Sequence, residues 1–312
     1  MALELYRCES PDCEYVTENP QADRCPLCGG TFFVKAEEGE VTPKGWLGLC
    51  READRDGRQP DAYAFCRRGA ETGDPACLCE QARRLLTGRG TAVDKPAAVA
   101  LLDRAAAGGD PEGQCLLGVC HEHGDGVPAD PESAVFLYRQ AADRSYAPAQ
   151  CNLGWCCEQG RGVDRDPGAA ARWYRKAAEG GHPRGQFCLA GCYDRGVGVP
   201  EDEIKAATWY KKAAEQGYAQ AMLQLGLCYE KGRGIGRSAE LALAWYKKAA
   251  EADCPPACLQ MGRLCETGRL GVARNYRDAL RWYRKAADAG DKEAADAVRR
   301  LEKSGLLGFL LG

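Results

Sequence analysis

The stretch AQCNLGWCCEQGRGVDRDPGAAARWYRKAAEGG, from Ala149 to Gly181, predicts two helices joined by a short turn. Small and apolar residues at three- and four-residue spacing predict the first helix, which stops at Gly160. Asp166 is a predicted N-cap of the second helix. Pro167 follows at the first helical position, where the missing proline N–H costs nothing. A glycine pair after the second helix favours termination there. The stretch is therefore a predicted helical hairpin.

The same pattern recurs every 36 residues along most of the chain. One small residue marks each period: Ala82, Gly118, Gly154, Ala190, Gly226 and Gly262. A glycine follows six positions later: Gly88, Gly124, Gly160, Gly196, Gly232 and Gly268. A period between about 20 and 50 residues indicates stacked repeats that share one continuous core.

Two further columns keep this period. The predicted N-caps of the second helices are Asp94, Asp130, Asp166, Asp202, Ser238 and, after a one-residue insertion, Asn275. A bulky pair, most often Trp-Tyr, recurs in those helices: Leu101-Leu102, Leu137-Tyr138, Trp173-Tyr174, Trp209-Tyr210, Trp245-Tyr246 and Trp282-Tyr283. We expect the small residues to let helices approach while the large aromatic side chain fills the gap between units.

Motifs such as Leu225-Gly226, Gly232-Arg233-Gly234 and Ala244–Ala250 (AWYKKAA) resemble the Sel1-like repeat family, relatives of tetratricopeptide repeats. The resemblance covers residues 77–292 with six repeats and implies a mainly α fold. A right-handed α-α superhelix of about seven hairpins is expected, counting a degenerate first repeat at 41–76. Residues 293–312 are expected to hold the end of a capping helix, Lys292 to Lys303, and an apolar tail.

Residues 1–40 do not share the repeat and predict a small metal-binding domain. Two close cysteine pairs are flanked by short β-prone runs, and the four thiols are Cys8, Cys13, Cys25 and Cys28. Four thiolates at this spacing suit a closed, structural zinc site, although iron also fits such a donor set. The second pair resembles the knuckle of a rubredoxin-like zinc ribbon, whereas the first has a longer gap. Disulfides or free thiols are the alternative.

The tetratricopeptide resemblance implies that the concave face, formed by the first helices, binds a protein or peptide. The implied partner-binding residues are Trp155, Glu158, Phe187, Leu223, Leu227, Glu230, Leu259 and Arg263. The alternative is that several of these side chains simply pack between repeats.

The remaining cysteines also follow the period, and the column Cys120, Cys156, Cys192 and Cys228 is predicted to be core. Four others have irregular spacing and form an alternative second metal group: Cys50, Cys66, Cys77 and Cys79. Repeat spacing on the order of 10 Å exceeds disulfide reach, which favours reduced thiols.

A net charge of −3 argues against nucleic-acid binding by bulk electrostatics. The chain lacks a long apolar run and a secretory signal pattern, so we expect a cytoplasmic protein, of bacterial type by its repeats. Three histidines and no phosphate loop offer no catalytic constellation, and we predict no enzyme. Two alternatives stay open: β-lactam binding or hydrolysis, as in cysteine-rich secreted relatives, and a nucleic-acid-associated adaptor acting through the zinc ribbon.

Overall fold

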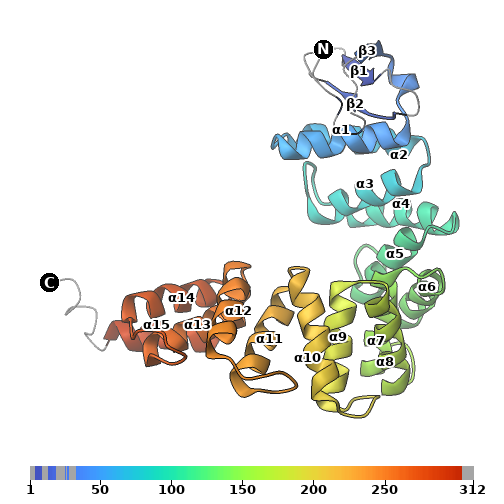
Figure 1. Cartoon of the computed structure of the whole chain (residues 1–312). Helices are drawn as coiled ribbons and strands as arrows, with labels where there is room; N and C mark the ends of the chain where they lie inside the picture. Colours follow the sequence, from blue (N-terminus) through green and yellow to red (C-terminus); the bar gives the residue numbers. More distant parts are fainter. Residues whose placement is uncertain (1–3, 9–12, 19–24, 26, 28–32, 304–312) are drawn as a thin grey trace. The chain divides into compact units, whose positions relative to one another are not determined.

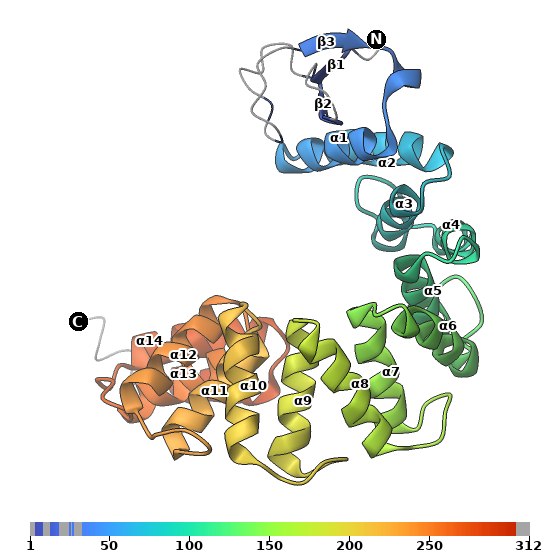
Figure 2. The same ribbon diagram turned by 45° about the vertical axis from the view of Figure 1, so that its right-hand side comes forward.

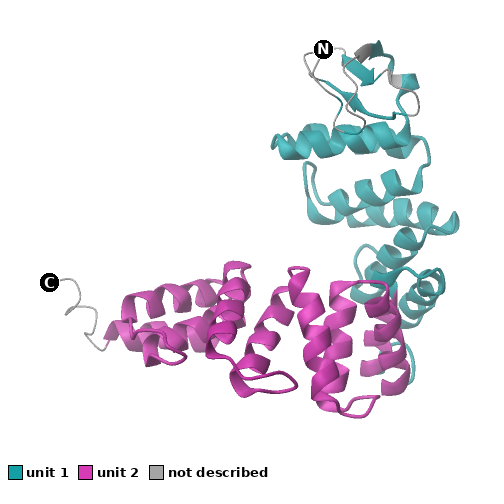
Figure 3. Cartoon of the chain, in the orientation of Figure 1, with its two compact units in different colours: residues 1–149, 160–164 teal, residues 150–159, 165–312 magenta. Residues whose placement is uncertain are grey.

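A computed structural model describes residues 4–8, 13–18, 25, 27 and 33–303. This part of the chain contains three β-strands and fifteen α-helices (Figure 1). Contacts divide the chain into two compact units, which are described separately below (Figure 3). Unit 1 holds residues 1–149 and 160–164, and unit 2 holds residues 150–159 and 165–312.

Unit 1 begins with a small antiparallel sheet in the order β2-β1-β3. Its strands are β1 (Leu5–Cys8), β2 (Val16–Thr17) and β3 (Phe33–Ala36). A 3-10 turn, η1 (Glu38–Glu40), leads to helix α1 (Pro43–Arg55). The sheet lies beside the hairpin that α1 forms with α2 (Gln59–Glu71) (Figures 1 and 2). Leu5 and Val16 from the sheet share one buried cluster with Trp46 and Leu49 from α1, so the domain is anchored on this hairpin.

Six helices complete unit 1 and pack as three successive hairpins. They are α1 (Pro43–Arg55), α2 (Gln59–Glu71), α3 (Pro75–Thr87), α4 (Lys95–Ala107), α5 (Pro111–His123) and α6 (Pro131–Asp143).

Unit 2 contains most of α7 and all the helices that follow it. They are α7 (Ala147–Gln159), α8 (Pro167–Glu179), α9 (Pro183–Arg195), α10 (Glu203–Glu215), α11 (Ala219–Lys231), α12 (Ala239–Glu251), α13 (Pro255–Thr267), α14 (Tyr276–Asp288) and α15 (Lys292–Lys303). The two units thus hold seven hairpins and one final helix, α15, which packs on α14. The predicted helical solenoid, preceded by a small sheet, is confirmed.

Local chemistry explains the helix ends. The side chain of each predicted N-cap accepts a backbone N–H in the first turn; Asp166, for example, accepts from Ala169 at 2.8 Å. At the opposite ends of first helices, Gly232 has φ 75° and donates its N–H to the carbonyl of Cys228. Only glycine adopts such a left-handed conformation without strain, which is why the glycine column keeps its place.

Where the small residue of the period is glycine, it lies against the tyrosine of the second helix: Gly118, Gly154, Gly226 and Gly262. A Cβ added to Gly226 would come within 2.6 Å of the Tyr246 ring, and Tyr246 is fully buried. The large aromatic side chain that was expected to fill the gap is thus the tyrosine in this repeat, and not the tryptophan beside it. Trp245 is half-buried, and the Lys248 ammonium lies 4.4 Å from the centroid of its ring. Tyr246 therefore fills the space between the helices, whereas the Trp245 ring is partly exposed and makes a cation–π contact with Lys248.

The last helix closes the array. Ala294, Ala297 and Leu301 of α15 are buried, while its other side carries charged residues. Among the helices described, none has the length and apolar composition that a membrane span requires. The predicted apolar tail, 306–312, lies outside the described residues.

Candidate functional site

Three of the four predicted metal ligands converge at the amino-terminal sheet. Cys8 ends β1, Cys13 precedes β2, and Cys25 lies in the segment between β2 and β3. Their sulfur atoms all lie within 4.8 Å of one another, and Cys13 Sγ is 3.4 Å from Cys25 Sγ. The fourth predicted ligand, Cys28, lies outside the described residues.

The donor set of this cluster suits a soft metal ion. Sulfurs bonded tetrahedrally to one zinc at about 2.3 Å lie about 3.8 Å apart, close to the separation found here. Cys8 and Cys25 are buried, and Cys13 is half-buried. The strand pairing that joins Tyr6 to Thr17 and Cys8 to Phe33 brings these distant cysteines together. This arrangement could hold a metal ion.

The alternative second metal group is not assembled. Its predicted members were Cys50, Cys66, Cys77 and Cys79. The Cys77 thiol instead donates to the carbonyl of Pro43 at 3.4 Å, and the Cys79 thiol donates to the Asp110 carboxylate at 3.6 Å. Burial raises the pKa of each of these two thiols to about 12, so both keep their protons.

The periodic cysteines are core residues, as predicted. Cys120, Cys192 and Cys228 are buried free thiols. Burial raises the pKa of Cys120 and Cys228 to about 11 and that of Cys192 to about 12. They pack as small apolar side chains and are poor nucleophiles.

The eight predicted partner-binding residues all belong to unit 2, but their environments differ. Trp155, Leu223 and Leu227 are half-buried, Leu259 is buried, and Arg263 is exposed. Arg263 forms an ion pair with Glu293 of α15. The predicted set therefore includes both partly accessible side chains and a side chain, Leu259, that packs in the core.

Two of the predicted residues, Glu158 and Glu230, belong to a repeating network that the sequence analysis missed. Glu230 accepts a hydrogen bond from Tyr246 Oη at 2.6 Å, and Arg269 of the next repeat lies 3.0 Å from its other oxygen. We call this network the Tyr–Glu–Arg ladder. Its carboxylates in unit 2 are Glu158, Asp194, Glu230 and Glu266, and its arginines are Arg195, Arg233, Arg269 and Arg300.

The ladder joins each repeat to the following one. Arg233 and Arg269 each follow the glycine that ends a first helix, Gly232 and Gly268. Where Val197 takes that loop position, Arg195 binds the preceding carboxylate at 3.3 Å. A signal was present in the sequence, because acidic residues keep the 36-residue period in the first helices. Their partners lie 37 to 39 positions downstream, or 34 in the case of Arg300, beyond the reach of helical spacing rules.

Beside the ladder lies a hollow of about 270 Å³. Glu158 and Arg195 form one side of it, and Phe187, Tyr210 and Gln224 contribute to the remainder. The Phe187 ring lies 5.7 Å from that of Tyr210 and 5.3 Å from that of Tyr218, measured between centroids. A hollow lined by aromatic rings together with amide and charged groups suits a side chain of a bound peptide.

The family model of the Sel1 repeat matches six consecutive segments: residues 78–110, 111–146, 147–182, 183–218, 219–254 and 255–291. Among solved structures, a Sel1 repeat protein from Oxalobacter formigenes is 29% identical with a TM-score of 0.67, covering 76% of this chain and 94% of that one. The protective antigen c5321 of uropathogenic Escherichia coli, which displays an SLR fold, is 31% identical with a TM-score of 0.61. That match covers 86% of this chain and 57% of the antigen.

The immunity protein Pa5087 of Pseudomonas aeruginosa shares the fold at 19% identity, with a TM-score of 0.50 over 69% of this chain and 81% of its own. No curated protein is similar enough in sequence to count as a match.

Proposed function

Because this chain belongs to the Sel1 repeat family, whose members generally act as protein-interaction scaffolds, we propose that it is an adaptor protein. Solenoids of this family are typically not enzymes. The proposed partner is a protein or an extended peptide, bound on the face of the first helices in unit 2. The residues that carry this role are the predicted set from Trp155 to Arg263.

The observation that supports this proposal most directly is the hollow beside Phe187. Two of the predicted partner-binding residues, Glu158 and Phe187, line it, and it combines aromatic rings with unlike charges from Glu158 and Arg195. Leu223 and Leu227 lie about one helical turn apart on α11, and both side chains are only half-buried. Apolar side chains that stay partly accessible in a row of repeats provide the area that peptide binding needs.

Site-specific photocrosslinking tests the surface. A photoreactive phenylalanine analogue at Leu227 should capture a partner from a lysate of the source cells. The same analogue at Leu241, which is 45% exposed on second helix α12, is the matched control. Capture at Leu241 but not at Leu227 would contradict the proposed face.

The cysteine cluster is proposed to bind one structural zinc ion through Cys8, Cys13, Cys25 and Cys28. A domain this small buries little apolar surface, so metal binding would supply much of its folding free energy. Four protein thiolates leave no ligand position for a substrate, which makes the role structural.

Metal analysis of the purified protein should find about one zinc per chain. The double variant Cys25→Ser, Cys28→Ser should lose the metal, whereas Cys79→Ser in α3 should retain it. A metal-free protein whose amino-terminal sheet keeps native hydrogen-exchange protection would refute the zinc site. A reducing compartment, the bacterial cytoplasm, is the proposed location, since the thiolate ligands and the buried thiols both require reduction.

A further inference from the structure

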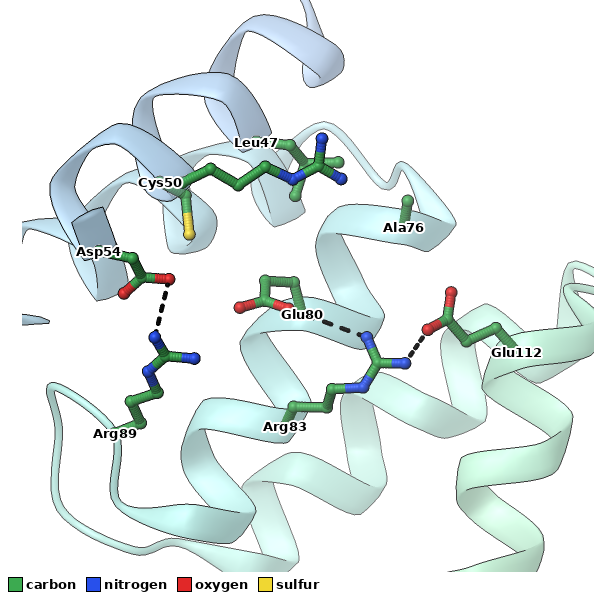
Figure 4. Close-up of a pocket in the computed structure, with 9 residues that line it drawn as sticks. Leu47, Cys50, Asp54, Ala76, Glu80, Arg83, Arg89 and Glu112 are labelled. Atoms are coloured by element: carbon green, nitrogen blue, oxygen red, sulfur yellow. Dashed lines mark hydrogen bonds and ion pairs between the residues drawn. The ribbon is translucent and has the colours of Figure 1, made fainter. Parts of the chain in front are cut away.

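A cavity of about 320 Å³ lies in unit 1 between helices α1 and α3 (Figure 4). Cys50 and Asp54 of α1 face it from one side, and Glu80 of α3 faces it from the other. Arg89 pairs with Asp54 at 3.3 Å, and Arg83 pairs with Glu80 at 3.8 Å. The cavity is therefore small, charged and open to solutes of a few atoms.

The guanidinium of Arg84 lies among these groups. Its side chain is 1% exposed, and it contacts three partners: Asp54 Oδ2 at 2.5 Å, Glu80 Oε1 at 2.9 Å and Cys50 Sγ at 3.1 Å. The three ligand atoms lie within 4.8 Å of one another, as in a metal site, but the arginine already supplies the cation. The buried Nη1 of Arg84 has no hydrogen-bond partner.

Charge balance around the cavity favours an anionic sulfur. Four guanidinium groups, those of Arg51, Arg83, Arg84 and Arg89, accompany the three carboxylates Asp54, Glu80 and Glu112. One further negative charge would neutralise the group. Cys50 lies closest to the buried guanidinium and can provide that charge by losing its proton.

The second thiol belongs to α2. Cys66 shares one buried cluster with Cys50. Its interaction with Cys50 lowers the pKa of Cys50, and the Arg84 charge adds to this effect, against the opposing effects of burial and of the Glu80 and Asp54 charges. The pKa of Cys66 is raised by its interaction with Cys50 and by burial, so Cys66 keeps its proton, and its thiol donates to the Tyr63 carbonyl at 3.2 Å. Cys79, buried one helix away beside Asp110, shows the opposite case, with a pKa of about 12.

We propose that Cys50 is a peroxide-reactive thiolate and that Cys66 is its resolving thiol. The Cys50 thiolate attacks the terminal oxygen of a small hydroperoxide, forming an S–O bond and breaking the O–O bond. The leaving alkoxide or hydroxide takes a proton from water. The sulfur loses two electrons to the peroxide and becomes a sulfenic acid.

The second step joins the two helices of the first hairpin. Cys66 loses its proton and attacks the Cys50 sulfenic sulfur, so that an S–S bond forms and the S–O bond breaks. The departing hydroxide takes the proton and leaves as water. The product is a Cys50–Cys66 disulfide directly beneath the amino-terminal sheet, whose residues Leu5 and Val16 share the same buried cluster.

The experiment uses the full-length, zinc-loaded, reduced protein and hydrogen peroxide at low molar excess. Peptide mass spectrometry should show a Cys50–Cys66 disulfide. In Cys66→Ser, a dimedone probe should label Cys50 instead, because the sulfenic acid is no longer resolved. In Cys50→Ser, neither product should form.

The matched control is Cys79, an equally buried thiol in the same unit. Cys50 should react with peroxide at pH 7 at least about tenfold faster than Cys79, since each pKa unit changes the thiolate fraction tenfold. Circular dichroism checks that the serine variants stay folded. An unmodified Cys50 under conditions that oxidise Cys79, or disulfides formed only between other cysteines, would overturn the proposal.

Discussion

In four of the second helices, α6, α8, α12 and α14, the tyrosine makes two contacts that set how closely the helices of a hairpin approach. Tyr246 presses its ring on Gly226 and donates its hydroxyl to Glu230. In the repeat of Tyr210 the small residue is Ala190 and the carboxylate is the shorter Asp194, which binds Arg233. In this repeat the added methyl group and the shorter acid occur together.

Tyr246→Phe removes the hydroxyl and should lower the free energy of unfolding by about 1 kcal/mol, the net contribution of one hydrogen bond. Urea midpoints measure the change. Tyr210→Phe is the control, because within the described residues no side chain hydrogen-bonds the Tyr210 hydroxyl. Equal losses in both variants would mean that the Glu230 contact does not contribute to stability.

Residue roles that depend on near neighbours could be predicted from the sequence. Asp166 was predicted as an N-cap because capping needs only the following three residues. Glu158 and Glu230 were predicted as partner-binding residues, and that role remains a prediction. Their contacts to Tyr174 and Arg269 could not be predicted, because they arise only when helices far apart in sequence are packed.

Helix α9 begins with an unusual cap. His182 Nδ1 accepts the N–H of Gly185 at 3.3 Å, whereas α3 and α5 begin at Asp74 and Asp110. An imidazole can accept at Nδ1 only while that nitrogen is unprotonated. Burial lowers the pKa of His182, with the nearby Arg184 charge as a further cause, so the neutral form is favoured in the folded chain.

This cap should make stability depend on pH. Because the folded pKa lies below the ordinary value of 6.5, the contribution is complete above pH 6.5 and is lost as the pH falls through the folded value. The thermal midpoint of the wild type should therefore fall between pH 7.5 and pH 5.5. His182→Asp, which caps in its charged form, should fall less; equal declines would exclude the histidine cap as the cause.

Element boundaries followed from the sequence wherever caps are strong. The last helix was predicted from Lys292 to Lys303 and has those bounds, since Asp291 caps it and its apolar stripe is regular. Which residue of the bulky pair is buried was harder to predict from the sequence. Trp245 and Tyr246 are adjacent and both aromatic, and only the direction of each side chain from α12 decides that the tyrosine is the buried one.

Each repeat gains its stability from its neighbours, so the end of the array needs a cover. In unit 2, α15 buries Ala294, Ala297 and Leu301, and Arg300 pairs with Glu266 at 2.5 Å. That arginine also holds the pKa of Glu266 below its ordinary value. The solenoid itself could be predicted from periodicity, but periodicity is common to the whole family and does not encode the partner.

Truncation after Gly290 should expose the face of α14 that α15 covers. Amide exchange in α13 and α14 should accelerate strongly, and the shortened protein should aggregate at lower temperature. Truncation after Lys303 removes only 304–312 and is the control. Unchanged exchange in α14 without α15 would show that the last hairpin is stable without its cover.

The Tyr–Glu–Arg ladder also bears on how such a chain can change length. Arg233 and Arg269 occupy the same position of successive repeats, and each binds a carboxylate 39 residues upstream, so these two junctions have the same chemistry. Excision of one period, residues 219–254, would bring Arg269 to the position that Arg233 occupies, opposite Asp194. A whole unit can thus be gained or lost by unequal recombination with the junction chemistry preserved, whereas a deletion whose length is not a multiple of 36 residues would leave both partners mismatched.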